Sequence, residues 1–198
     1  MNTPRATDGR RARGDATRRL VAFRAAQIAT VSGLDSITVG GLSGDTGVSK
    51  SGILTVFPSR EAIQIAAVAE AREIYLRSVI RPAWAAPSGT PRLRALLDSW
   101  RAYLLDGTFE GGCFISATTA EYGHREGPVA QAIRDLKREW LDVLERELTS
   151  AGATEPATDA FRIDAYLTAG NQRRELFGRD DELDRAHLWA SRVLDAIA

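Results

Sequence analysis

The fold is decided by residues 33–60, which read GLDSITVGGLSGDTGVSKSGILTVFPSR. Short apolar runs are broken here by glycine, serine and threonine, and this pattern predicts two short helices over about 39–45 and 49–55. Gly47 lies in the expected turn between them. Two short helices joined by a tight glycine-containing turn match the helix-turn-helix motif, although an ordinary helical hairpin has the same spacing.

The second short helix has the side chains expected of a helix that enters the DNA major groove. Small hydroxyl groups allow a close approach and can bond to base edges or phosphates, while a lysine adds positive charge. Thr38 and Ser49 are the expected N-caps of the pair. The outward-facing candidates on the second helix are Ser49, Lys50, Ser51 and Thr55, and the residues available for packing are Ile53, Leu54, Val56 and Phe57.

Helices are also predicted on both sides of this stretch, with no strand. Apolar residues at helical spacing indicate a first helix from about Asp15, its N-cap, to Ser32, and a fourth from Ser59 to about Ile80 that Pro82 ends or follows. Five more are expected over about 91–106, 113–122, 126–150, 157–177 and 181–197. The fold class is therefore all-α, with nine helices.

The formal net charge of zero conceals an asymmetry along the 198 residues. Residues 1–60 hold nine basic and four acidic side chains, a balance of +5, so the remainder has −5. Such a division suggests two modules with different partners, although a solvated basic tail gives the same arithmetic. A single cysteine, Cys113, favours a reducing, cytoplasmic setting. No apolar run is long enough to predict a membrane span.

Residues 18–65, and above all GVSKSGILTVFPSREAI at 47–63, resemble the DNA-binding domain of the tetracycline-repressor (TetR) family of bacterial regulators. The matching features are the apolar first helix, the turn at Gly33, and the motifs Ile37-Thr38-Val39, Gly47-Val48-Ser49, Phe57 and Ser59-Arg60-Glu61. A second stretch, 111–141, looks like a ligand-domain subgroup of the same family. The resemblance implies a helix-turn-helix DNA-binding domain over 1–60 and a ligand-binding and dimerisation domain over 61–198.

Several positions depart from the family pattern. Leu54 stands where the family usually has a tyrosine that touches a phosphate, and Val56 stands where it usually has a histidine. Arg60 replaces a lysine and keeps the charge. The first short helix contains three glycines, Gly40, Gly41 and Gly44, each costing a helix interior about 1 kcal/mol relative to alanine. These departures predict a loosely held helix and a DNA affinity that is modest or depends on the N-terminal arm.

The resemblance also assigns roles to particular residues. The basic segment before the first helix, with Arg5, Arg10, Arg11 and Arg13, would act as a DNA-binding arm that is disordered without DNA, or else as an expendable solubilising tail. The residues predicted to contact a double-stranded operator are Thr38, Ser49, Lys50, Ser51, Thr55, Arg60 and Arg18.

In this family the middle helices enclose an effector cavity. The residues predicted to bind a small apolar or aromatic effector are Trp100, Tyr103, Phe114, Thr118, Glu121, Tyr122 and Trp140, with Thr119 as a further polar group. A homodimer is expected through the last two helices, whose predicted close-packing positions are Ala165, Thr168, Ala169, Leu183, Ala186, Ala190, Val193 and Leu194.

The expected function is an effector-responsive repressor that binds a palindromic operator as a dimer, with no enzymatic activity, cofactor, metal or membrane partner. Residues 40–51 lack the Gly-Lys pair of a phosphate-binding P-loop. His124 and His187 match no zinc spacing, and Cys113 is either a buried small side chain or a redox-sensing thiol. Two alternatives are a helical enzyme or carrier that uses the aromatic pocket, and a helical module that has lost DNA binding.

Overall fold

The computed structural model describes residues 5–197, apart from the side chains of residues 5–8, 10 and 11, and this part of the chain is helical without a strand. The elements are α1 (Arg5–Ser32), α2 (Val39–Thr46), α3 (Lys50–Val56), α4 (Arg60–Tyr75), α5 (Arg81–Ala83), α6 (Thr90–Leu105), α7 (Phe114–Tyr122), α8 (Pro128–Ser150), α9 (Pro156–Phe177) and α10 (Asp181–Asp195). Because α4 and α5 are joined without a break, the described residues form nine helical segments. The all-α prediction is confirmed.

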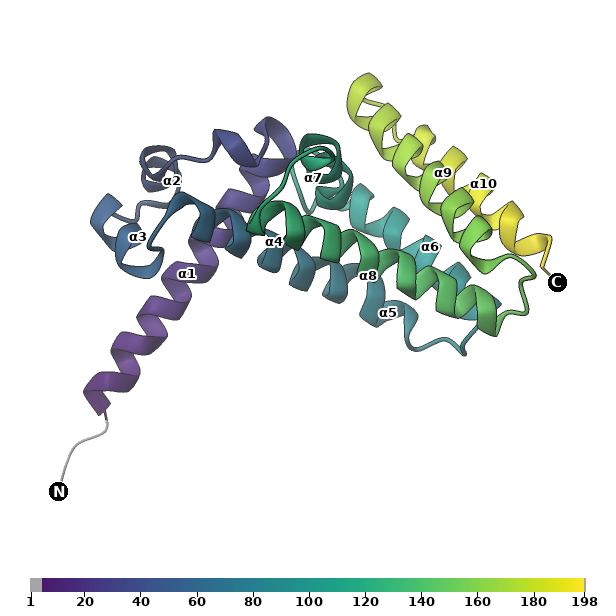
Figure 1. The fold of residues 1–198 in the computed structure, drawn as a ribbon, viewed down its shortest axis with the longest axis horizontal. Helices are drawn as coiled ribbons and strands as arrows, with labels where there is room; N and C mark the ends of the chain where they lie inside the picture. The colour runs from purple at the N-terminus through teal and green to yellow at the C-terminus, as the bar shows by residue number, and fades with distance from the viewer. Residues whose placement is uncertain (1–4, 198) are drawn as a thin grey trace.

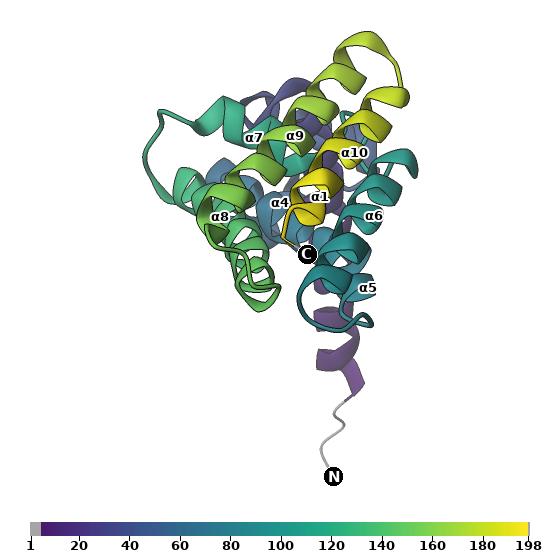
Figure 2. The same ribbon diagram turned by 90° about the vertical axis from the view of Figure 1, so that its right-hand side faces the viewer.

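The molecule is elongated, with α2 and α3 at one end and the pair α9 and α10 at the other (Figure 1). Helix α1 packs against α2, α3 and α4, and α4 packs in turn against α8. Helices α8 and α6 then contact α9 and α10 respectively. The α9–α10 pair lies on the outer side of the body, where it faces the viewer in Figure 2. The first four helices are thus linked to the far end mainly through α4 and α8.

The predicted helix starts are confirmed by their hydrogen bonds. The hydroxyl of Thr38 accepts from the N–H of Gly41 at 3.0 Å. The hydroxyls of Ser49 and Ser59 accept in the same way from residues three positions on, each at 3.1 Å. These caps satisfy N–H groups that have no partner within the helix. The turn before α3 contains Gly47 in the left-handed region, with φ of 69°.

Helix α1 is longer than predicted, because it begins at Arg5 and passes through Asp15 without a cap. The expectation of a disordered arm is therefore wrong for residues 5–14, while residues 1–4 lie outside the described part of the chain. This segment is rich in alanine and arginine, which are good helix formers, and its two glycines cost only about 1 kcal/mol each. The side chain of Arg13 also donates to the carbonyl of Gly9 at 3.1 Å.

The fourth helix does not end at Pro82, contrary to the prediction. A π-helical turn, Leu76–Ile80, follows α4, and the N–H of Arg81 donates to the carbonyl of Leu76, five residues back. The chain then continues as α5 to Ala83. Proline has no N–H group and normally interrupts an α-helix, and here it directly follows a turn whose hydrogen bonds are already shifted. Such π turns are frequent at functional sites.

The last two helices bury part of the face that was predicted to lie at a dimer interface. Leu183, Ala186, Ala190 and Leu194 are at most 4% exposed and belong to the core of the chain itself. Their assignment to a surface is wrong, because α10 uses this stripe to pack against α9 and α6. Ala165 and Ala169 remain exposed on α9. The large exposed apolar side chains of these helices are Phe161, Tyr166, Leu176, Phe177, Leu188 and Trp189.

The glycines of α2 allow a direct test of how firmly this helix is held. Gly44 lies inside α2, and a Cβ added to it meets no atom within 4 Å. Gly44→Ala should therefore raise the free energy of unfolding by up to about 1 kcal/mol, measured by urea denaturation. Gly47→Ala is the control and should lower it, because the left-handed conformation of Gly47 strains any residue with a Cβ. Destabilisation by Gly44→Ala would contradict this account of α2.

Candidate nucleic-acid interface and cavity

The residues predicted to contact DNA lie on one end of the molecule, around α3. All seven are exposed: Arg18, Thr38, Ser49, Lys50, Ser51, Thr55 and Arg60. The ammonium of Lys50 has no ion-pair partner among the described residues, and its side chain passes close to Gly40 at the start of α2. Ser49 is occupied as the cap of α3, and the hydroxyl of Thr55 donates to the carbonyl of Ser51 at 2.8 Å.

One side chain of α3 differs from what the sequence predicted. Leu54 was expected to pack inside the bundle, but it is 53% exposed on α3. The buried positions of this helix and its end are Ile53 and Phe57, which anchor it to α1. The guanidinium of Arg18 lies 5.1 Å from the ring centre of Phe57, so this arginine is held against α3 from α1.

Arg60 does not extend freely toward solvent. Its guanidinium donates to the backbone carbonyl of Asp35 and lies 3.6 Å from the carboxylate of the same residue. Gln64, one turn further along α4, donates to the carbonyl of Leu34 at 2.9 Å. The first turns of α4 therefore hold the segment between α1 and α2, which we call turn 33–36: Gly33 and the 3₁₀ helix Leu34–Ser36.

The same turn is held from the other side by Glu121, at the end of α7. Its carboxylate accepts from the N–H of Leu34 at 2.8 Å and from the N–H of Asp35 at 3.1 Å. Gly33 has φ of 87°, and a Cβ there would lie 2.9 Å from a carboxylate oxygen of Glu121. Glycine is thus required both by the backbone conformation and by the close approach of this side chain.

Asp35 ties three elements together at this point. Its carboxylate accepts from the hydroxyl of Tyr122 at 3.1 Å and from the guanidinium of Arg125, with Arg60 beside it. The hydrogen bond from Arg125 lowers the pKa of Asp35 below its usual value. Burial, and then the hydrogen bond to Asp35, raise the pKa of Tyr122 to about 12. Each shift favours the protonation state that keeps this network intact.

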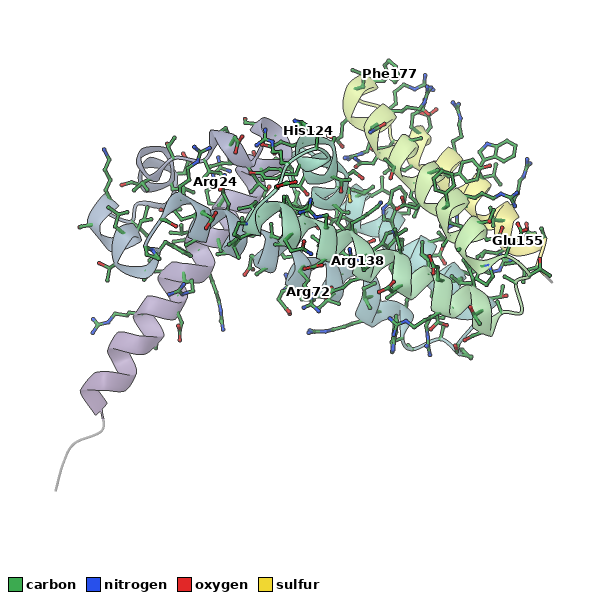
Figure 3. The ribbon with its side chains drawn as sticks, in the orientation of Figure 1. Arg24, Arg72, His124, Arg138, Glu155 and Phe177 are labelled. Carbon is green, nitrogen blue, oxygen red and sulfur yellow. The ribbon has the colours of Figure 1, made fainter. Side chains whose placement is uncertain are left out.

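A second contact joins α1 to the loop between α6 and α7. The amide side chain of Gln27 donates to the carbonyl of Thr108 and accepts from the N–H of Glu110, both at 2.8 Å. Arg24, labelled in Figure 3, bridges Asp45 of α2 and Glu110 at 2.8 and 2.7 Å. Gly111 lies so close to α1 that a Cβ would come within 2.2 Å of the carbonyl of Thr30. The loop therefore fits directly against the α1 backbone.

A cavity of about 560 Å³ lies between α4 with its π turn and α8. Its apolar walls include Tyr75 and Trp140, whose rings meet edge to face at 5.6 Å. The full set of lining residues is Arg72, Tyr75, Leu76, Ile80, Trp84, Leu136, Glu139, Trp140, Asp142, Val143, Glu145 and Arg146. The volume lies within the range of small-molecule sites, which are mostly apolar with a few polar groups.

Of the seven residues predicted to bind a ligand, Trp140 borders this cavity. Tyr103 and Phe114 are instead packed in the core on either side of Phe109, at ring distances of 6.3 and 5.9 Å. The hydroxyl of Thr118 donates to the carbonyl of Phe114. These three side chains were predicted to face a ligand because they are aromatic or polar on consecutive helices, and the same pattern is satisfied by an interior without a cavity.

The remaining predicted positions point elsewhere. Glu121 and Tyr122 are directed at turn 33–36, and Trp100 borders a small hollow beside Cys113. Sequence reasoning missed Tyr75 and Trp84. Tyr75 continues the apolar face of the fourth helix beyond Ile74, which is a usable signal, whereas Trp84 lies between Pro82 and Pro87 and outside every helix that the sequence predicts.

The hollow beside Cys113 is polar and nearly filled. Lys137 donates to both carboxylate oxygens of Asp164, at 2.6 and 2.7 Å, and the indole N–H of Trp140 donates to the same carboxylate at 3.1 Å. Burial raises the pKa of the Cys113 thiol, which is the opposite of what a reactive thiol requires. The interpretation of Cys113 as a buried small side chain fits this environment better than the redox-sensing interpretation.

The fold therefore has two short helices joined by a glycine-containing turn at one end, as in a helix-turn-helix, and a cavity in its body. The model of the tetracycline repressor-like C-terminal domain matches residues 89–188. The chain therefore belongs to the TetR family of transcriptional regulators. No curated protein matches it.

Solved structures show the same fold along nearly the whole chain. A TetR transcriptional regulator from Chloroflexus aurantiacus is 22% identical with a TM-score of 0.83, over 94% of this chain and 96% of that one. A TetR-family regulator from Streptomyces coelicolor is 18% identical with a TM-score of 0.80, over 92% and 95%. AibR, solved in complex with isovaleryl coenzyme A and operator DNA, is 16% identical with a TM-score of 0.67, over 91% of this chain and 95% of that one.

Over residues 5–197, no helix has the length and apolar character needed to cross a membrane. Within the same residues, no group of three or more histidine, cysteine, aspartate or glutamate side chains is arranged to hold a metal ion.

Removal of the Glu121 carboxylate should loosen turn 33–36. Glu121→Ala leaves two N–H groups without their acceptor and should lower the free energy of unfolding by about 1–3 kcal/mol. Amide hydrogen exchange at Leu34 and Asp35 should accelerate in the folded state. Glu126→Gln changes an exposed carboxylate nearby and serves as the control. Unchanged exchange at both amides in Glu121→Ala would contradict the proposed anchoring.

Proposed function

We propose that this protein is an effector-responsive transcriptional repressor that acts in the cytoplasm and binds a palindromic operator as a homodimer. The observation that carries the proposal is the course of α4. Its first turns hold turn 33–36 through Arg60 and Gln64, and its last turns line the cavity through Arg72 and Tyr75. One helix therefore touches both the DNA-binding end and the ligand cavity.

The DNA-binding surface is α3 with its neighbours. Lys50 is exposed and unpaired among the described residues, so it can contact a phosphate or a guanine. The exposed side chain of Leu54 offers an apolar contact of the kind that recognises a thymine methyl group. This contact would replace the phosphate contact of the tyrosine that the family usually has at this position. Arg18, held against Phe57, is placed to reach the backbone beside α3.

The dimer interface is the exposed face of α9 and α10. Phe161, Leu188 and Trp189 are 71, 50 and 43% exposed there. An apolar face of this kind on a monomer is typical of a surface covered by another protein. A two-fold dimer places two recognition helices about 34–36 Å apart, which matches one turn of DNA. Support also comes from AibR, a protein of the same fold that was solved with operator DNA and isovaleryl coenzyme A.

The response to an effector follows from the same geometry. A ligand between α4 and α8 would shift the π turn and α4, and with them Arg60, Gln64 and turn 33–36. The separation of the two α3 helices in the dimer would then differ from the spacing that fits DNA. A ligand changes this equilibrium only if it binds one of the two arrangements more tightly. We also propose that the protein has no enzymatic activity.

Selection of bound DNA from a random pool tests the DNA-binding function, and the selected sequences should contain a palindrome. Lys50→Ala should then weaken binding to the selected DNA about tenfold and reduce its dependence on salt, because one phosphate contact is lost. Arg138→Ala removes an exposed positive charge on α8, far from α3, and should leave affinity unchanged. Equal affinity of Lys50→Ala and the parent protein would show that α3 is not the recognition helix.

The dimer is tested by a charge placed on its apolar face. Leu188→Glu should yield monomers in analytical ultracentrifugation at micromolar concentration, with the helical content unchanged, because a desolvated carboxylate opposes association. Leu105→Glu alters a similarly exposed leucine outside α9 and α10 and should leave the assembly intact. A Leu188→Glu protein that sediments as the parent does would place the interface elsewhere.

A further inference from the structure

We propose that the cavity between α4 and α8 takes a flat aromatic cation. This inference rests on the proposed function, since it names the chemical class of the effector. It starts from the walls of the cavity, which contain three aromatic side chains: Tyr75 from α4, Trp140 from α8, and Trp84 from the end of α5. Flat aromatic walls favour a planar ligand, and aromatic faces attract cations electrostatically.

The chain already places a cation on one of these rings. The guanidinium of Arg92 lies 4.7 Å from the ring centre of Trp84. The charge of Arg92 is itself balanced by the buried carboxylate of Glu147 at 2.9 Å. Arg92 therefore covers one face of Trp84 without leaving a free positive charge that would repel an incoming cation.

The charged side chains of the cavity favour a cation over an anion. Its three carboxylates, Glu139, Asp142 and Glu145, follow one another along α8 at helical spacing. Only Glu139 is paired, through a 2.7 Å contact with Arg72. Among the described residues, the carboxylates of Asp142 and Glu145 have no ion-pair or hydrogen-bond partner. Two negative groups at the cavity are thus available to a ligand.

The two arginines of the cavity already have partners, so they are less available to an anionic ligand than the free carboxylates are to a cation. Arg72 is shared between Glu139 and Glu73, at 2.7 and 3.2 Å, so its charge is already neutralised. Arg146 uses one N–H to bind the backbone carbonyl of Asp142 on its own helix. The lining as a whole therefore has a net negative charge, three carboxylates against two guanidinium groups.

The interior end of the cavity adds one polar group. Tyr75 is 6% exposed and borders both the cavity and the small hollow beside Cys113. Its hydroxyl has no hydrogen-bond partner within the described residues, and burial raises its pKa well above the usual value, so it remains a neutral donor and acceptor. This hydroxyl can donate a hydrogen bond to a ligand heteroatom or accept one from it.

A pair of probes with one ring system and opposite charges tests this assignment. Binding of 9-aminoacridine and of acridine-9-carboxylate to the DNA-free protein is measured by isothermal titration calorimetry. The cation should bind at least tenfold more tightly than the anion, with an affinity that falls as salt is added. No binding of the cation, or equal binding of both probes, would overturn the proposal.

Variants at the rim then locate the site. The double variant Asp142→Asn/Glu145→Gln should weaken binding of 9-aminoacridine about tenfold, and Arg146→Gln should strengthen it a few-fold, since one positive charge is removed. Glu126→Gln removes a carboxylate outside this cavity and should change nothing. An unchanged affinity in the double variant would place the bound dye elsewhere and contradict the proposal. Because no DNA is present, failure of the DNA-binding function would leave this result unaffected.

Discussion

The two hydrogen bonds that the Glu121 carboxylate accepts from turn 33–36 help to fix the position of the end of the molecule that contains α2 and α3. Helices α2 and α3 contact each other and α1, so their position relative to the body is set by how α1 and the turn that follows it are held. Glu121 holds that turn from α7, and Arg60 and Gln64 hold it from α4. Any movement of α7 or α4 must therefore either carry α2 and α3 with it or break these bonds.

The continuous segment α4–π turn–α5 connects turn 33–36 to the cavity. An α-helix transmits displacement along its axis because its hydrogen bonds leave little freedom within it. The π turn is where this regularity is interrupted, and it lies at the wall of the cavity. The elements that a bound molecule would touch and those that fix α3 are consequently parts of one mechanical unit, with α8 as the opposite wall.

Most of the fold could be predicted because caps and apolar spacing are local properties. Thr38, Ser49 and Ser59 begin their helices as the sequence indicates. The cavity could not be predicted in the same way, because an aromatic residue such as Phe114 has the same spacing whether it faces a core or a void. The role of Glu121 was also beyond reach, since its partners lie 86 and 87 residues away in the sequence. Register shifts such as the π turn have no sequence signal as clear as a cap.

The length of α1 has a consequence for how this protein could meet a partner. A disordered basic arm loses about 1–2 kcal/mol of backbone conformational free energy for each residue that it orders on binding. Residues 5–14 are already helical as a continuation of α1. Most of this conformational free energy is therefore lost on folding, before the protein meets a partner. A preformed helix is also straight and fixed in direction by the packed half of α1. It would therefore bind best to partners whose surface already follows the direction of this helix, and it would not adapt to surfaces of many shapes.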